Sequence, residues 1–356
     1  MKRLLKTILY PWGAVYGGIA AIRRQLYRCG FFKSYFPDIL AVGVGNLAVG
    51  GTGKTPHTAL IAEILAGKCK TAMLSRGYGR KTKGFVLANT VAPARLSADL
   101  IGDEPLLLHN RLPKLPLAVS ENRKDGIERL LQYAPDLEAV VMDDAYQHLA
   151  VTPSCRIILT EYDRPYFQDF PLPAGHLREF PSAVCDADAV IVTKTEVQAG
   201  EIDRAEWQRK LKLSARQPLF FTHYAYGNPV PVTAAAAAGG LRPGQACTLL
   251  AGIANPEPLR RHISAEYNNV QCLYYPDHHR YTEKDIAHVS KQTPTGAVVF
   301  TTEKDWMRLQ ADGIKKAVSL LPIFTVPIQV EFSTREEKET FINLITELCK
   351  KKKEKE

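Results

Sequence analysis

The sequence predicts an α/β protein with a parallel sheet covered by helices on both faces, followed by a second, smaller α/β unit. Three observations carry this expectation. Short apolar runs typical of buried strands alternate with amphipathic stretches from residue 39 to about residue 224. A segment rich in Pro and Gly, Gly227–Gly244, interrupts this pattern, and the alternation then resumes. One apolar run, Ile39–Val44, leads through a glycine-rich turn into an amphipathic stretch, which is the order a phosphate site requires.

Length and composition agree with a folded protein of two domains. The chain has 356 residues, of which 46% are hydrophobic and 23% charged, as in ordinary globular proteins. Its seven cysteines are scattered and form no Cys-x-x-Cys pair. This spacing argues against a disulfide framework or a structural zinc site and fits a reducing compartment.

The N-terminus accounts for most of the net positive charge. Of the net charge of +9, seven charges fall within residues 1–37, which contain no acid: Lys2, Arg3, Lys6, Arg23, Arg24, Arg28 and Lys33. A nucleic-acid-binding protein would spread such charges over a folded face, so the clustering favours an anionic membrane surface and no nucleic acid.

The uncharged run Thr7–Ile22 lies inside this basic segment and is flanked by aromatic residues. As a helix it would cover about 24 Å, less than the ~30 Å of a hydrocarbon core. We therefore expect a helix that lies in the membrane interface rather than across it. A signal peptide does not fit, because the charged stretch that follows leads directly into the strand at Ile39–Val44 and its glycine-rich turn. An ordinary core helix remains the alternative.

The elements expected after this segment follow in order. Strands of the larger unit are predicted at 39–44, 70–75, 115–119, 137–142, 155–160, 187–192 and 219–224, and helices near 103–111, 121–133 and 202–213. The smaller unit has predicted strands near 248–252, 271–275 and 297–302, and helices near 256–264, 282–291 and 304–311. The predicted domains are residues 1–37, 38–226, a linker at 227–244, 245–333, and a C-terminal helix and charged tail at 334–356.

The stretch Gly43–Thr55 is the strongest functional signal, because its strand–loop–helix order predicts a P-loop NTPase-like fold. Glycine backbone N–H groups can close around phosphate oxygens, Lys54 can reach the β- and γ-phosphates, and the Thr55 hydroxyl can take Mg²⁺. The residues predicted to bind nucleotide are Ala48, Val49, Gly50, Gly51, Thr52, Gly53, Lys54 and Thr55. Ala48 departs from the usual pattern, which has glycine six residues before the lysine.

Acidic residues and histidines follow other predicted strands. Asp143 and Asp144 end the strand at 137–142, where a carboxylate beside a phosphate loop can coordinate Mg²⁺. The Asp277-His278-His279 cluster can supply a base or the group that orients one. Asp103 begins a predicted helix, and on the residues alone a helix N-cap is the favoured interpretation.

Two further segments have an open interpretation. Thr193-Lys194-Thr195-Glu196 follows a buried strand and is similar to the guanine-reading element of GTPases, but glutamate replaces the usual aspartate, so we expect only a wall beside the nucleotide base. Thr302-Glu303-Lys304-Asp305 is similar in character and fits a capping box for the next helix.

Short motifs follow one another over roughly residues 1–310. They are Val44-Gly45-Asn46-Leu47, Gly50-Gly51-Thr52-Gly53-Lys54-Thr55-Pro56, Ser75-Arg76-Gly77-Tyr78-Gly79, Gly102-Asp103-Glu104-Pro105, Asp143-Asp144-x-x-Gln147-His148, Pro173-Ala174-Gly175-x-Leu177-Arg178-Glu179, Asp277-His278 and Thr302-Glu303-Lys304-Asp305. Their content and order resemble the tetraacyldisaccharide 4′-kinases, the lipid A 4′-kinases.

The resemblance implies a membrane-associated kinase of two domains, the smaller of which closes over the nucleotide. Such a kinase transfers the γ-phosphate of ATP, with Mg²⁺, to the 4′-hydroxyl of a tetraacylated glucosamine disaccharide 1-phosphate in lipid A biosynthesis. The implied location is the cytoplasmic face of the inner membrane of a Gram-negative bacterium, with a lipid-linked disaccharide as substrate and no obligate protein partner.

Roles are also implied for individual residues. Asp103 becomes the base rather than a mere cap, His278 its partner, and Lys54 and Asp144 act with them in catalysis. The implied metal-binding residues are Thr55, Asp143 and Glu179. Those implied for the acceptor or the transferred phosphoryl group are Arg76, Arg123, Gln147, His148 and Arg178. Ala145 departs from the glycine that usually follows the two aspartates.

A membrane-recruited nucleotide switch, either a GTPase or an ATPase that acts through a protein partner, is the alternative. The basic N-terminus and the Thr193–Glu196 segment suit it. The glutamate in that segment and the Asp-His cluster of a second domain speak against it, because a switch needs neither.

Overall fold

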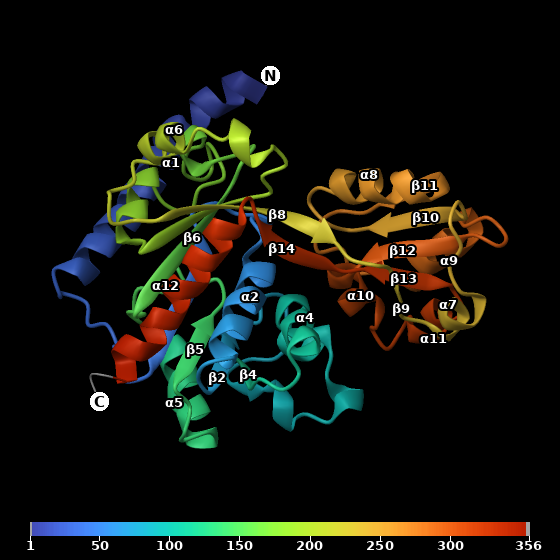
Figure 1. The fold of residues 1–356 in the computed structure, drawn as a ribbon, viewed down its shortest axis with the longest axis horizontal. Helices are drawn as coiled ribbons and strands as arrows, with labels where there is room; N and C mark the ends of the chain where they lie inside the picture. The colour runs from blue at the N-terminus through green and yellow to red at the C-terminus, as the bar shows by residue number, and fades with distance from the viewer. Residues whose placement is uncertain (1, 354–356) are drawn as a thin grey trace.

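The structure, a computed structural model that describes residues 2–353, contains two β-sheets (Figure 1). The larger sheet has nine strands in the order β14-β8-β7-β6-β1-β5-β2-β4-β3. Its strands are β1 (Leu40–Asn46), β2 (Thr71–Ser75), β3 (Val86–Leu87), β4 (Leu117–Val119), β5 (Ala139–Met142), β6 (Cys155–Glu161), β7 (Ala189–Thr193), β8 (Leu219–Tyr226) and β14 (Ile328–Phe332). Only the edge strands β3 and β14 pair antiparallel, so the predicted parallel sheet is confirmed.

Helices cover both faces of this sheet. They are α2 (Lys54–Ala66), α3 (Ala98–Ile101), α4 (Asp103–Arg111), α5 (Arg123–Tyr133), α6 (Arg204–Lys210) and α12 (Arg335–Lys353), with short 3-10 turns at Ala88–Thr90, Pro93–Arg95, Tyr166–Gln168, Pro181–Asp186 and Ala199–Glu201. Successive residues of a strand point to opposite faces. Leu40 and Val42 of β1 therefore pack in one cluster with α2, α4 and α12, whereas Ala41 packs with α5 on the other side. Buried apolar side chains on both faces explain why the strands appear as continuous apolar runs.

The smaller sheet has five strands in the order β11-β10-β12-β13-β9. They are β9 (Val230–Pro231), β10 (Ala246–Ala251), β11 (Asn268–Tyr274), β12 (Val298–Thr302) and β13 (Ile323–Val326), and the helices are α7 (Ala234–Gly239), α8 (Glu257–Glu266), α9 (Glu283–Gln292), α10 (Glu303–Leu309) and α11 (Lys315–Ser319). Apolar residues of α8 pack on one face, and those of α9 and α11 pack on the other. The predicted second α/β unit is therefore present.

Strand pairing places two segments differently from the predicted boundaries. Val230–Pro231, inside the predicted linker, pairs with β13 of the smaller sheet. Ile328–Phe332, inside the predicted smaller domain, pairs with β8 of the larger sheet. Only Pro327 separates β13 from β14, so residues two positions apart belong to different sheets. Apolar alternation cannot tell which sheet a short edge strand joins, and the domain limits themselves stay a prediction.

The N-terminal helix α1 (Lys2–Arg28) lies along the outside of the larger unit (Figure 1). Its glycines allow close packing: a Cβ on Gly13 or Gly17 would lie 2.7 Å from atoms of Pro171 and Phe180, respectively. Its exposed large apolar side chains include Ile8, Tyr10, Trp12, Val15, Tyr16, Ile19 and Ile22. Within residues 2–353, no helix combines the length and apolar character that a membrane crossing needs. The predicted helix is present, and its place in a membrane interface stays a prediction.

Candidate active site

The phosphate loop connects β1 to α2 at the centre of the larger sheet. Gly53 occupies the N-cap of α2 with φ +87°, a left-handed conformation that side chains disfavour. A Cβ at this position would also lie 2.0 Å from the hydroxyl oxygen of Tyr224. Both the backbone conformation and the close approach of Tyr224 therefore require glycine here. Gly50 has φ +109° for the same kind of turn. Lys54 and Thr55 then begin α2, as the sequence predicts.

The first half of the loop is bound to another segment. The N–H of Val49 donates to the carbonyl of His176 at 2.8 Å, and the N–H of Arg178 donates to the carbonyl of Leu47 at 2.7 Å. Ala48 lies between them, in a bridge to Leu177. This pairing explains why alanine is tolerated there: the residue is extended and faces a strand-like partner. The nucleotide-binding role of Ala48 and Val49 stays a prediction, and the N–H of Val49 is already engaged.

Two aspartates face the loop from the end of β5. Lys54 Nζ lies 3.6 Å from Asp144 Oδ1, and Arg178 Nη1 donates to both Asp144 oxygens at 3.0 Å. Burial alone would raise the pKa of Asp144, but Lys54 and Arg178 outweigh it and lower that pKa. The hydroxyl of Thr58 donates to Asp143 Oδ1 at 3.0 Å. The structure thus brings Lys54, Asp143, Asp144 and Arg178 together.

The surroundings of Asp143 indicate whether these residues could hold a divalent cation. It is only 1% exposed, and burial followed by the nearby carboxylates of Glu104 and Asp144 raises its pKa. A buried carboxyl among like charges is stabilised by a cation. Within residues 2–353 there is no group of three His, Cys, Asp or Glu side chains that could hold a metal. The residues therefore fit Mg²⁺ only where phosphate oxygens complete its coordination, as in other phosphate-loop enzymes.

Glu179, a predicted metal ligand, is held by an arginine of α1. Arg24 Nε donates to Glu179 Oε2 at 2.6 Å and Arg24 Nη2 to Oε1 at 2.8 Å, while Arg24 Nη1 reaches Asp186 at 2.7 Å. Arg24 is 4% exposed, so this member of the basic cluster predicted for a membrane surface is a buried ion-pair partner instead. Sequence reasoning could not find this contact, because Arg24 lies more than a hundred positions from both carboxylates.

The remaining residues predicted to bind substrate have different surroundings. Arg123 is buried, and its guanidinium donates to the carbonyls of Ser120 and Asp143. Gln147 donates to the carbonyl of Asn46 at 2.9 Å and accepts from Arg178. Burial, followed by the charges of Arg123 and Arg76, lowers the pKa of His148 to about 4, so its ring is neutral at pH 7. Arg76 itself is exposed. Their roles stay predictions.

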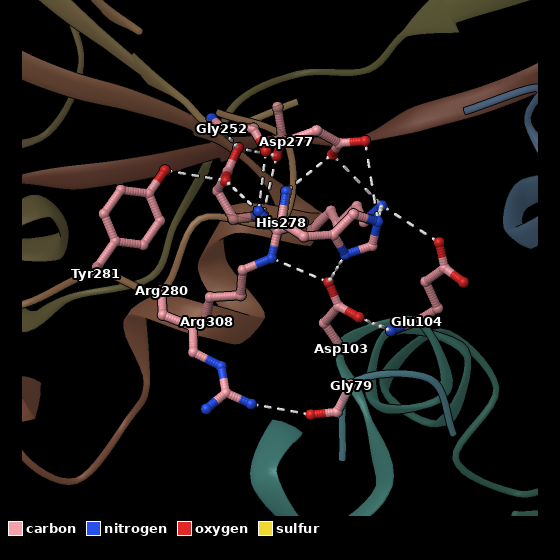
Figure 2. A network of polar contacts seen from close by, with 12 residues as sticks. Gly79, Asp103, Glu104, Gly252, Asp277, His278, Arg280, Tyr281 and Arg308 are labelled. Atoms are coloured by element: carbon pink, nitrogen blue, oxygen red, sulfur yellow. Dashed lines mark hydrogen bonds and ion pairs between the residues drawn. The ribbon is translucent and has the colours of Figure 1, made fainter. Parts of the chain in front are cut away.

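Asp103 and His278 meet where the two units touch (Figure 2). Gly102 takes the N-cap position of α4, so Asp103 is the first helical residue, and the predicted N-cap is wrong. Its Oδ1 accepts the N–H of Glu104 at 3.0 Å, and its Oδ2 lies 3.2 Å from His278 Nδ1. His278 has φ +59°, a strained conformation that aims its ring across the interface.

Two basic residues of α10 complete this cluster. Arg308 Nε donates to Asp103 Oδ2 at 2.9 Å, and Lys304 Nζ lies 3.1 Å from His278 Nε2 and 3.2 Å from Glu104 Oε1. Burial alone would raise the pKa of Asp103, but the His278 hydrogen bond and the charges of Lys304 and Arg308 hold it well below its usual value. The sequence pointed to Lys304 only as part of a capping motif, and it did not point to Arg308.

The two segments left open also have defined places. Thr302 caps α10 by accepting the N–H of Asp305, which confirms the N-cap half of the predicted capping box. The hydroxyl of Thr193 donates to the carbonyl of Thr52 at 3.0 Å, so this segment borders the phosphate loop. Glu196 forms an ion pair with Arg261 of α8 at 2.9 Å. Its role as a wall for the nucleotide base stays a prediction.

The fold and the site define a class: an α/β protein of the phosphate-loop type, with a lysine and paired aspartates at the loop and a separate Asp–His pair across a domain contact. A nucleotide-dependent phosphotransferase is the class that needs both parts. Comparisons with known proteins identify the family within this class.

The family model described as tetraacyldisaccharide-1-P 4′-kinase (LpxK) matches residues 5–348. A tetraacyldisaccharide 4′-kinase of Flavobacterium johnsoniae is 39% identical over 325 residues, which cover 90% of this chain and 92% of the relative. One from Cytophaga hutchinsonii is 42% identical over 313 residues, or 86% of each chain. A crystal structure of the "apo" form of LpxK from Aquifex aeolicus in complex with ATP has a TM-score of 0.73 and 26% identity, and covers 96% of this chain and 99% of that one.

The chain therefore belongs to the tetraacyldisaccharide-1-P 4′-kinase family, the kinases of lipid A biosynthesis. The resemblance, the fold class and the class of activity predicted from the sequence are confirmed. A family of enzymes leaves the alternative of a nucleotide switch without support.

Proposed function

We propose that this kinase transfers the γ-phosphate of ATP to the 4′-hydroxyl of a tetraacylated glucosamine disaccharide 1-phosphate. The observation that carries the proposal is the meeting of two groups of residues. Asp103 and Glu104 begin α4, whose buried leucines pack in one cluster with residues of α2, the helix that begins at Lys54. The Glu104 carboxylate is also one of the charges that raise the pKa of Asp143. The Asp103–His278 pair is therefore near the residues that face the phosphate loop, as an acceptor hydroxyl between them requires.

Each residue has a task that follows from its position. The backbone N–H groups of Gly50–Thr55 and the Lys54 ammonium bind the phosphates of ATP, because both are donors at a helix N-terminus. Lys54 and Arg178 now share Asp144, so an incoming γ-phosphate competes with this carboxylate for two cations. Mg²⁺, held by Thr55 and Asp143, would neutralise charge that develops on the phosphate oxygens.

Asp103 orients the acceptor hydroxyl and takes its proton. Oδ2 is occupied by His278 and Arg308, while Oδ1 accepts only the N–H of Glu104 among the hydrogen bonds in the described residues. An oxygen with a remaining lone pair can accept a hydroxyl proton. Phosphoryl transfer has a loose transition state in most analyses, so positioning matters more than a strong base.

We expect the protein to contact the membrane through α1. Its exposed apolar side chains and the basic residues of segment 1–37 other than the buried Arg24 would bind an anionic bilayer. The acyl chains of the substrate would stay in the lipid while the sugar reaches the site. We expect a peripheral enzyme on the cytoplasmic face of the inner membrane of a Gram-negative bacterium.

The test is ATP turnover with and without a tetraacylated glucosamine disaccharide 1-phosphate, followed by location of the new phosphate. We expect turnover that depends on this lipid and a phosphate on the 4′-oxygen. Slow hydrolysis that no lipid acceptor stimulates would overturn the proposal.

A further inference from the structure

Arg308 joins the two units of the protein at the predicted base. It lies on α10 of the smaller unit, and its Nε donates to Asp103 Oδ2 on α4 of the larger unit, 205 positions away. The same Oδ2 faces His278 Nδ1 at 3.2 Å. Two groups of the smaller unit therefore converge on one carboxylate oxygen of the larger unit (Figure 2).

The guanidinium is fixed from within its own unit. Its Nη1 donates to the carbonyl of Gly252 at 2.9 Å and to Asp305 Oδ1 at 3.1 Å. Asp305 is fully buried and is held in turn by the Tyr281 hydroxyl at 3.0 Å and by the N–H of Gly252 at 3.0 Å. Because these contacts lie within the smaller unit, that unit sets the orientation in which the Arg308 guanidinium meets Asp103.

The guanidinium of Arg308 has one donor group that these contacts do not use. Arg308 is 7% exposed, yet its Nη2 group is buried without a hydrogen-bond partner in the part of the chain that the structure describes. Buried donors are normally satisfied, and each exception calls for an explanation, of which a role in catalysis is one. Arg308 also lines a cavity of about 820 Å³, together with Asp103 and His278.

We propose that Arg308 is a positioning residue for phosphoryl transfer, which sets the Asp103 carboxylate beside His278 when the smaller unit lies against α4. The inference rests on the proposed role of Asp103 as base and adds the residue that assembles it. The reaction site is then complete only while the two units are in contact. The charged groups around Asp103 are Glu104, Asp277, His278, Lys304, Asp305 and Arg308.

A second arginine shows that contact between the units does not by itself explain Arg308. Arg111 of α4 forms an ion pair with Glu303 of α10 and donates to the carbonyl of Ile328 at 3.0 Å. It joins the same two helices but, within the part of the chain that the structure describes, forms no hydrogen bond or ion pair with Asp103. Arg111→Met is therefore the matched control, because it removes an ion pair between the units and leaves the Asp103 oxygens untouched.

The first experiment measures kcat, the KM for ATP and the pH profile of kcat with the full-length enzyme and its lipid acceptor. For Arg308→Met we expect a loss in kcat of about 10²-fold, as for other small misplacements of a reacting group. The KM for ATP should change little. Loss of the positive charge raises the pKa of Asp103, so the acid limb of the profile should move to higher pH. Arg308→Lys should keep that limb near the wild-type position but still lower kcat, because an ammonium cannot make the same fork of hydrogen bonds.

The second experiment combines Arg308→Met with Asp103→Asn, which also guards against simple misfolding. If Arg308 acts through Asp103, the double variant should be no slower than Asp103→Asn alone, because coupled residues are non-additive. Losses that multiply, or a wild-type kcat and acid limb in Arg308→Met, would overturn the inference. Arg111→Met should keep the wild-type kcat and the wild-type acid limb of the pH profile. Wild-type turnover in Asp103→Asn would instead overturn the proposed base, so the two failures can be told apart.

Discussion

The phosphate loop and the Asp103 cluster are built in opposite ways. The loop takes its shape from Gly43–Thr55, a continuous stretch between a central strand and the helix that follows it. In the Asp103 cluster, Asp103 contacts His278, which is 175 positions away in the sequence, and Arg308, which is 205 positions away. Both partners belong to the smaller unit, which has its own sheet. A nucleotide site can thus be encoded locally, whereas the proposed proton-accepting site exists only through the contact of two folded units.

This difference predicts different kinetic consequences. A change in the loop should weaken nucleotide binding and turnover together, because the same residues hold the phosphates before and during transfer. A change in the Asp103 cluster should reduce turnover alone, because none of its members bonds to the loop in the described structure.

The largest effect is expected for Lys54→Ala. Loss of the ammonium removes charge stabilisation from the migrating phosphoryl group, so kcat/KM should fall by at least about 10³-fold. The protein should remain folded, since the one side-chain contact of Lys54 within residues 2–353 is a 3.6 Å ion pair with Asp144. Steady-state kinetics measure the fall in kcat/KM, and circular dichroism measures whether the variant is folded. Near-normal transfer by a folded Lys54→Ala enzyme would show that the loop is not the catalytic phosphate site.

Asp103→Asn should come next and should separate the two regions. General-base catalysis is worth typically 10²–10⁴-fold, so kcat should fall by about that factor. The affinity for ATP, measured by isothermal titration calorimetry, should stay within about threefold because the loop is intact. A variant that loses ATP affinity but turns over normally when saturated would mean that Asp103 supports structure, not proton transfer.

Arg24→Met tests a third region, where α1 meets the catalytic domain. Removing Arg24 leaves Glu179 as a buried charge without its partner, which typically costs about 3–5 kcal/mol of unfolding free energy. Arg28→Met is the matched control, because Arg28 pairs with Asp186 at the surface, where ion pairs contribute about 0–1 kcal/mol. Chemical denaturation of both variants provides the measurement. Equal stability of the two would mean that Glu179 does not depend on α1.

The smallest effect concerns the membrane. Ile19 is 64% exposed on α1, and burying such a side chain in the interface is worth about 1.5 kcal/mol. Ile19→Ser should therefore weaken binding to anionic phospholipid vesicles about tenfold, as measured by vesicle sedimentation. Leu320→Ser, which removes a 79% exposed leucine from the smaller unit, should not. If both variants bind like the wild type, the membrane contact lies elsewhere.

Much of the fold followed from the sequence because the central strands are buried on both faces. Apolar runs such as Ala139–Met142 have one interpretation, and their order with the helices implied a parallel sheet. The pairing of the edge strands could not be predicted from the sequence. The strand Ile328–Phe332 alternates exposed and partly buried residues, and nothing in its composition distinguishes pairing with β8 from pairing within the smaller sheet.

The sequence by itself determined the phosphate loop, its lysine, the two aspartates at the end of β5 and, through its motifs, the family. These features depend on local backbone geometry, such as the positive φ of Gly53, and local geometry is written in adjacent residues. The tertiary structure alone decided that Arg24 holds Glu179 and that Arg308 reaches Asp103. Each of these ion pairs joins residues more than a hundred positions apart, and only the packing of whole helices and sheets determines which distant charges meet.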